Sequence, residues 1–140
     1  MTKQVRRLAL VVEDDPILQR AMIEHLEAEA FEVRAAFDYD TAVRHLEACV
    51  PDVACVDLGL PIESGYSLCE HIRRQSRFAG VPILVTSERS FPEDMANAEE
   101  AGANAFLKKP FSMKQLIKYV GALLDGPHAS RPSVRRLRIS

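Results

Sequence analysis

Apolar runs divide the chain into short segments, and each run is followed by a stretch with apolar residues at helical spacing. Residues 8–12, 53–56 and 81–86 are almost wholly apolar, which is typical of strands buried on both faces. Residues 31–35 alternate and predict a strand with one exposed side, and residues 105–107 predict a brief fifth strand. The pattern therefore predicts five strands, none of them long.

Helix signals lie between these runs. Asp15 and Pro16 fit an N-cap and a first helical position, and Leu18, Ala21, Met22 and Leu26 follow at spacings of three and four. Further helices are predicted over residues 41–49, from near Ser64, over residues 92–101 and from Ser112. Gly102 fits the C-terminal cap of the fourth helix.

Five strand-then-helix units with short connections predict an α/β fold. We expect a five-stranded parallel sheet with helices on both faces, in a (βα)5 arrangement. Parallel strands all finish at one edge of the sheet, and ligands of such folds bind outside the carboxyl ends of the strands. Polar residues that directly follow the apolar runs are therefore the candidates for chemistry.

Length and composition indicate a single domain, which we place at residues 5–125. The chain has 140 residues and a net charge of −2, which does not favour a nucleic-acid groove. Cys49, Cys55 and Cys69 contain no C-x-x-C pair and are expected to be reduced thiols. No apolar run is long enough to cross a membrane, and the N-terminus is unlike a signal peptide. A cytoplasmic location is expected.

Residues 126–140 lose periodicity and contain four arginines, two prolines and a glycine. We predict a disordered basic tail or the start of a linker there. Its arginines could touch nucleic acid, but a solvated tail is the preferred interpretation because no helix-turn-helix pattern follows. His25, His45 and His71 fall on predicted helices and are expected at the surface.

Acidic residues end two of the apolar runs. Glu13 and Asp14 follow the run over residues 8–12, and Asp57 follows the run over residues 53–56. A single such acid is most simply a loop residue that caps the next helix, but three carboxylates at one sheet edge repel one another and favour a bound cation. Mg²⁺ prefers such oxygen ligands and also accepts phosphate oxygens. Lys109 after the fifth strand adds a cation, and a carboxylate can act as a nucleophile toward phosphorus.

Four motifs in order resemble the CheY-like receiver domains of two-component response regulators. They are Leu10-Val11-Val12-Glu13-Asp14-Asp15-Pro16, Val56-Asp57-Leu58-x-Leu60-Pro61-x-x-x-Gly65, Ala101-Gly102-Ala103 and Leu107-x-Lys109-Pro110-Phe111. Each motif alone is weak, but the four together cover nearly all of the predicted domain. The resemblance implies a flavodoxin-like fold.

The resemblance also implies a role for each matching residue. Asp57 matches the phosphoacceptor, which takes a phosphoryl group from a phosphohistidine on a sensor histidine kinase or a histidine phosphotransfer protein. Asp14 matches the direct Mg²⁺ ligand and Glu13 the one that reaches the ion through water, while Asp57 and the carbonyl of Gly59 complete the protein ligands. Lys109 matches the residue that pairs with the phosphoryl oxygens.

Two further matches concern switching. Phe106 matches the aromatic residue whose rotamer tracks activation, and the family spacing places the switch hydroxyl at Ser87 rather than Thr86. A downstream protein would then read the surface of the fourth helix, fifth strand and fifth helix. Glu88 and Gly59 depart from the usual residue types at their positions, so we expect altered phosphorylation or hydrolysis rates.

The resemblance implies a phosphoacceptor signalling domain that assists its own phosphorylation and dephosphorylation, rather than an enzyme. A single-domain regulator or phosphorelay shuttle is the first expectation, and a receiver from a longer DNA-binding regulator is the near alternative. Two rivals are a phosphorylation-independent interaction module and a phosphatase with an aspartate nucleophile. The phosphatase would normally need a second acid two residues after Asp57, where Gly59 stands.

Overall fold

The strands form one parallel sheet in a computed structural model that describes residues 6–125 and 138–139. The strand order is β2-β1-β3-β4-β5-β6, and each neighbouring pair is parallel. The strands are β1 (Leu8–Val12), β2 (Glu32–Ala36), β3 (Val53–Asp57), β4 (Ile83–Ser87), β5 (Ala105–Lys108) and β6 (Arg138–Ile139). The helices are α1 (Pro16–Ala28), α2 (Tyr39–Ala48), α3 (Gly65–Arg73), α4 (Pro92–Glu100) and α5 (Met113–Asp125), with a 3₁₀ turn, η1 (Ser76–Phe78).

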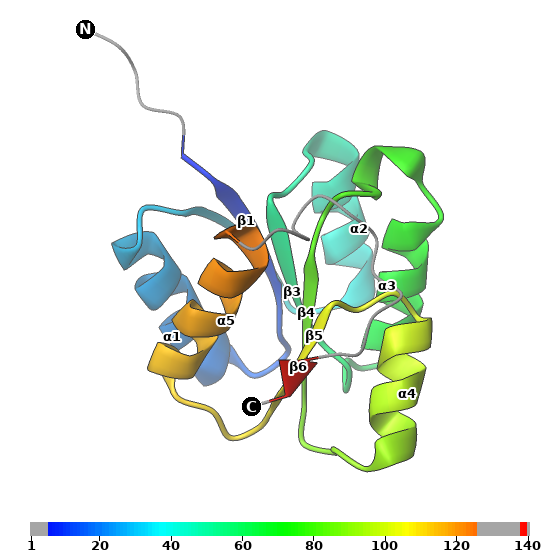
Figure 1. Cartoon of the computed structure of the whole chain (residues 1–140). Helices are drawn as coiled ribbons and strands as arrows, with labels where there is room; N and C mark the ends of the chain where they lie inside the picture. The colour runs from blue at the N-terminus through cyan, green and yellow to red at the C-terminus, as the bar shows by residue number, and fades with distance from the viewer. Residues whose placement is uncertain (1–5, 126–137, 140) are drawn as a thin grey trace, which may run out of the picture.

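The sheet separates two layers of helices, as Figure 1 shows: α1 and α5 lie on one side, and α2, α3 and α4 on the other. Two hydrophobic clusters correspond to these layers. One contains Leu68, Phe78 and Phe106, and the other contains Met22, Leu116 and Leu107. The predicted α/β fold with five parallel strands and helices on both faces is confirmed. Within the described residues, no helix combines the length and apolar character needed to cross a bilayer.

The sixth strand was not predicted from the sequence. Arg138–Ile139 pairs with β5 at the edge of the sheet, in the segment expected to be a tail without regular structure. The prediction for residues 126–137 and for Ser140 lies outside the described residues. The two residues that are described form a strand, and for the segment as a whole the tail or linker stays a prediction.

Helix starts follow the polar caps in the sequence. Asp15 accepts hydrogen bonds from the backbone N–H groups of Ile17 and Leu18, and Ser64 accepts one from Ser67. Helix α2 begins at Tyr39, two residues before the predicted start, because Asp38 accepts a hydrogen bond from the backbone N–H of Thr41. These caps satisfy N–H groups that have no partner within the helix.

Gly65 lets the chain turn back tightly after β3. A Cβ atom at this position would lie 2.2 Å from the carbonyl oxygen of Asp57 and 2.7 Å from the Cα atom of Leu58. The N–H of Gly65 also donates to the carbonyl of Leu58. The start of α3 is therefore packed directly against the backbone that carries Asp57.

Candidate functional site

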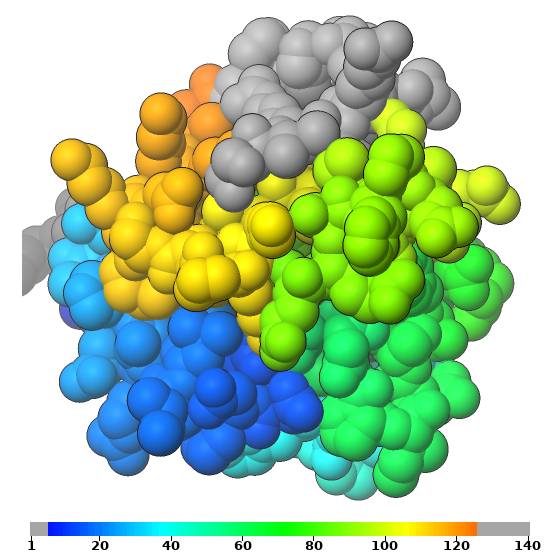
Figure 2. Space-filling model, turned by 90° about the horizontal axis from the view of Figure 1, so that it is seen from below, coloured from blue at the N-terminus to red at the C-terminus, as the bar shows by residue number. Residues whose placement is uncertain are grey.

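The candidate site lies at the carboxyl edge of the sheet, next to the junction between β1 and β3. The strand order 2-1-3-4-5 changes direction there, and this change opens a crevice in doubly wound folds. Figure 2 views the molecule from this end: the segment after β1 (blue) meets the segments after β3 (green), β4 (lime) and β5 (yellow to orange). Residues far apart in the sequence therefore converge at this edge.

Three carboxylates meet in this crevice. Glu13, Asp14 and Asp57 each offer one oxygen, and these oxygens all lie within 4.8 Å of one another. Glu13 and Asp57 are buried, with 0 % and 4 % of their surface exposed, whereas Asp14 is exposed. Like charges this close repel one another and favour a bound cation, as expected from the sequence.

Backbone groups hold the two buried acids in place. The N–H of Asp15 donates to Oε2 of Glu13 at 3.0 Å, and the N–H of Gly59 donates to Oδ1 of Asp57 at 2.9 Å. The Asp15 amide at the end of the β1–α1 loop and the turn after β3 thus orient the carboxylates toward a common point.

Lys109 supplies the positive charge of the site. Its Nζ lies 3.0 Å from Oε1 of Glu13 and 3.3 Å from Oδ2 of Asp57. Its backbone N–H donates to the carbonyl of Ser87 at 2.8 Å, so the residue is anchored to the end of β4. From its position just after β5, the lysine bridges both buried acids.

Burial makes the charge of Glu13 costly. It raises the pKa of this carboxyl from 4.5 to about 7, against the hydrogen bonds from Asp15 and Lys109, and the charge of Asp57 adds to the rise. Burial alone would lower the pKa of Lys109, but the hydrogen bond with Glu13 and the negative charge of Asp57 outweigh it, so the pKa is raised. The lysine is held in its charged form next to a carboxyl that ionises reluctantly.

The donor set fits a hard divalent cation. Oε1 of Glu13 is the buried side-chain oxygen that lacks a hydrogen-bond partner among the described residues. Lys109 Nζ is close to it, yet the hydrogen bond from Nζ goes to Oε2 at 3.3 Å. A buried carboxylate oxygen that accepts no hydrogen bond, beside two further carboxylates, is the kind of environment that Mg²⁺ stabilises.

The remaining predicted residues lie on the strands and the turn next to this cluster. Ser87 ends β4, and its Oγ accepts a hydrogen bond from the N–H of Arg89 at 3.0 Å. Thr86 pairs with Asp57 in the sheet register. Phe106 is fully buried in the cluster on the α2–α4 side of the sheet. Gly59 lies in the turn after β3, where its N–H contacts Asp57.

Two supporting residues were missed in the sequence. Gln19 is buried on α1, and its Nε2 donates to the carbonyls of Glu13 and Ala36. Asp94 is buried at the start of α4, where it accepts hydrogen bonds from Arg89 and from the N–H of Phe91. Gln19 adjoins the apolar stripe of its helix, a position at which a polar residue signals a buried hydrogen bond.

A groove of about 560 Å³ opens beside the cluster. It is lined by the start of α1, by the β5–α5 loop and by Glu88, and Lys109 reaches into it. Ile17 on its rim is 82 % exposed. Lys109, whose Nζ contacts Glu13 and Asp57, thus links the groove to the site.

Comparison with known proteins places this geometry in context. Residues 9–121 match the family described as response regulator receiver domain. The phosphate regulon transcriptional regulatory protein PhoB of Escherichia coli is 34% identical over 118 residues, which cover 84% of this chain and 52% of PhoB. The transcriptional regulatory protein CseB of Streptomyces avermitilis is 35% identical over 127 residues, 90% of this chain and 53% of CseB. The chain spans about half the length of the curated relatives it matches.

Solved structures agree with the fold. The chemotaxis response regulator CheY4 of Vibrio cholerae superimposes with a TM-score of 0.82 and 26% identity, over 86% of this chain and all of CheY4. A putative response regulator from Chloroflexus aurantiacus has a TM-score of 0.80 and 29% identity, over 86% of this chain and 98% of that protein.

Proposed function

This chain belongs to the response regulator receiver domains of two-component systems, and on that premise we propose that it is a switch controlled by phosphorylation of Asp57. The observation that carries the proposal is the position of Asp57: it is buried at the end of β3, 3.3 Å from Lys109 Nζ and within reach of the oxygens of Glu13 and Asp14. A carboxylate that lies next to a lysine and two further carboxylates is suited to phosphoryl transfer.

In the proposed reaction, an oxygen of Asp57 attacks the phosphorus of a phosphohistidine on a partner protein. The new O–P bond forms as the P–N bond breaks, and the electron pair of that bond stays on the imidazole nitrogen. Lys109 lies on the side of Oδ2, where its charge would offset that of the transferred oxygens. The N–H of Gly59 holds Oδ1 and so fixes the orientation of the nucleophile.

Glu13, Asp14, Asp57 and the carbonyl of Gly59 are the proposed ligands of Mg²⁺. When bound, the ion would neutralise negative charge on the carboxylates and on the phosphoryl oxygens. Asp14 is the exposed member of the set and leaves the site open to solvent. Glu13 contributes the buried oxygen that lacks a hydrogen-bond partner.

The proposed switch uses Ser87 and Phe106. A phosphoryl group on Asp57 would attract the Ser87 hydroxyl, which must first give up its hydrogen bond from the N–H of Arg89. Phe106 would then turn toward the space that Ser87 vacates, and the surface of α4, β5 and α5 would change. A downstream protein is the proposed reader of this surface.

Sensor histidine kinases or histidine phosphotransfer proteins are the proposed donors. The groove beside Lys109 offers them apolar contacts at Ile17 and Leu18, next to the nucleophile. A cytoplasmic location belongs to the same proposal, in keeping with the free thiols of Cys49, Cys55 and Cys69.

The primary test is covalent labelling. Incubation with acetyl phosphate and Mg²⁺ should add one phosphoryl group, detected by intact mass spectrometry and removed by hydroxylamine. Asp57→Asn should remain unlabelled. Glu63→Gln, which alters an exposed acid in the β3–α3 loop, should be labelled like the wild type. An adduct that persists in a folded Asp57→Asn protein would place the phosphoacceptor elsewhere.

The assignment of the switch hydroxyl has its own test. Ser87→Ala should uncouple phosphorylation from spectroscopic changes at Phe106, whereas Thr86→Ala should leave the coupling intact. The opposite pattern would transfer the role to Thr86.

A second candidate is a receiver within a longer transcriptional regulator. It is favoured by the coverage of PhoB and CseB, each matched over about half of its length. An immunoblot of the native host with an antibody against residues 6–125 would show a polypeptide of about twice the mass of this chain if the longer protein exists. A band at 15.6 kDa would exclude this candidate.

A further inference from the structure

The edge of β5 carries an intramolecular strand. Arg138 pairs with Ala105 and Ile139 pairs with Phe106, both in parallel register. Figure 1 shows β6 beside β5, between the layer of α1 and α5 and the layer of α4. Without β6, β5 would be the last strand on this side of the sheet, with unpaired backbone groups along its outer edge.

The segment that supplies β6 and the adjacent helix carry opposite charges. Residues 126–140 include Arg131, Arg135, Arg136 and Arg138 and no acidic residue. Helix α4 contains Glu93, Asp94, Glu99 and Glu100 and no basic residue. Asp94 is engaged with Arg89, while Glu93 and Glu100 are exposed. A basic strand next to β5 is therefore favoured by the acidic helix that flanks this edge.

From these observations we propose that the outer edge of β5 is a strand-docking surface, and that Arg138–Ile139 occupies it in competition with a protein partner. The partner segment is extended and basic, with arginine or lysine next to a β-branched residue, and it replaces β6 by main-chain pairing with Ala105 and Phe106. This inference deepens the proposed function and rests on it for the statement that a downstream protein binds the α4–β5–α5 surface.

A two-residue strand suits competition because it forms few hydrogen bonds. Its connection to α5 through residues 126–137 keeps it near the edge, so a weak contact persists at a high effective concentration. A separate peptide lacks this advantage. It should bind well only when the internal strand is prevented from pairing.

Hydrogen exchange of the full unphosphorylated chain tests the pairing itself. Successive N–H groups of a strand point to opposite sides, so at least one of the variants Arg138→Pro and Ile139→Pro removes a donor that faces β5. That variant should accelerate amide exchange within residues 105–107 by about tenfold or more, with β3 unchanged. Ser130→Pro, which changes a residue of the same segment outside β6, is the matched control and should exchange like the wild type.

Peptide binding tests the partner chemistry. A synthetic peptide of residues 133–140 should perturb the NMR signals of residues 105–107 and α4 in the faster-exchanging proline variant, and perturb them far less in the wild-type chain. A peptide with its three arginines replaced by glutamate should bind at least about tenfold more weakly, because α4 would repel it.

Three outcomes would overturn the inference. Exchange at β5 that is equal in the wild type and both proline variants would show that β6 does not protect this edge. Equal binding of the basic and acidic peptides would remove the role of α4. Protection that depends on protein concentration would assign the strand to a second copy of the chain. None of these measurements requires phosphorylation, so a failure of Asp57 to accept a phosphoryl group would be seen separately in the labelling experiment.

Discussion

Glu13 has an environment that disfavours its charge. It is wholly buried, one of its oxygens has no hydrogen-bond partner, and burial raises its pKa to about 7. Because the folded state prefers the protonated carboxyl, the stability associated with this residue is present below pH 4.5 and is lost as the pH rises through about 7.

Glu13→Gln should therefore stabilise the protein in buffer free of divalent cations at pH 8. We expect the free energy of unfolding to increase by about 1–3 kcal/mol, since each pKa unit corresponds to about 1.4 kcal/mol. Urea denaturation at pH 8 and pH 5 measures the effect, which should be small at pH 5. A loss of stability at pH 8 would show that the ion pair with Lys109 outweighs the cost of burial.

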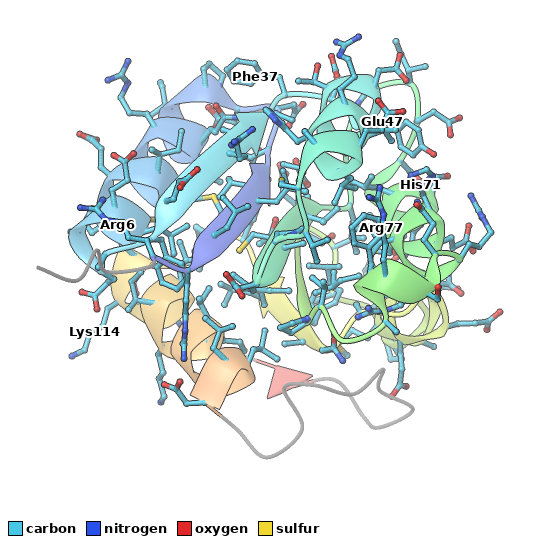
Figure 3. The ribbon with its side chains drawn as sticks, turned by 90° about the horizontal axis from the view of Figure 1, so that it is seen from above. Arg6, Phe37, Glu47, His71, Arg77 and Lys114 are labelled. Carbon is cyan, nitrogen blue, oxygen red and sulfur yellow. The ribbon has the colours of Figure 1, made fainter. Side chains whose placement is uncertain are left out.

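His71 is a second titratable residue whose environment changes its pKa, and here the expectation of a surface histidine was too simple. It is half-buried on α3, with the Tyr39 ring edge-on at 6.0 Å, and Figure 3 shows it on the same side of the molecule as Glu47 and Arg77. Burial, followed by the charge of Arg74, lowers its pKa below 6.5. Its Nε2 lies 3.0 Å from the amide nitrogen of Gln75 and accepts a hydrogen bond in the neutral ring.

Protonation of His71 should destabilise the fold. The unfolded chain binds this proton more readily, so stability should fall as the pH drops below 6.5 toward the lower pKa of the folded state. His71→Gln should reduce that slope in thermal denaturation between pH 7 and pH 5. His25→Gln, on the exposed side of α1, is the control, and an equal change in both variants would contradict the prediction.

At the scale of single elements, the turn between β3 and α3 is tightly packed. Gly65→Ala places a methyl group against the backbone of Asp57 and Leu58, and such overpacking costs about 1–3 kcal/mol. Gly121→Ala is the matched control, because a Cβ atom there meets nothing within 4 Å. In the middle of α5 it should stabilise by about 0.5–1 kcal/mol. Chemical denaturation of both variants tests the pair, and a stable Gly65→Ala protein would contradict the close packing.

Helix α4 begins with a capping interaction that the sequence did not reveal. Asp94 Oδ2 accepts a hydrogen bond from the N–H of Phe91 at 3.0 Å, and Oδ1 lies 3.3 Å from Nε of Arg89. Asp94→Ala should lower the free energy of unfolding by about 1 kcal/mol. Glu93→Ala, an exposed acid in the same turn, should change it less, and equal losses in the two variants would count against the cap.

The elements were predictable wherever their signals were local. The apolar runs located β1, β3 and β4, and Asp15, Ser64 and Ser112 marked helix starts, because strand burial and capping depend on neighbouring residues. Convergence of Glu13, Asp57 and Lys109 followed from the parallel topology. The hydrogen bonds of Gln19 and Asp94 depend on partners from other segments, and the pairing of Arg138–Ile139 depends on the free edge of β5. Local sequence patterns therefore could not predict them.

At the scale of the whole molecule, occupation of the acidic site should stabilise the fold. With Mg²⁺ at about 100 times its Kd, binding to the native state adds about 2.7 kcal/mol to the free energy of unfolding. Asp14→Asn should abolish this gain and Glu63→Gln should retain it, as measured by thermal denaturation across a Mg²⁺ titration. A Mg²⁺ effect that survives in Asp14→Asn would place the ion elsewhere.

The sheet keeps its two flanking cores apart. The groove beside Lys109 is built largely from α1 and the β5–α5 loop, whereas Phe106 and α4 belong to the packing on the opposite side. A phosphate donor that docks in the groove would thus contact the layer of α1 and α5. The proposed movement of Phe106 would take place in the hydrophobic cluster on the other face of the sheet. If the proposed function holds, the residues that contact the upstream protein can vary while Phe106 and α4, on the other face of the sheet, stay unchanged.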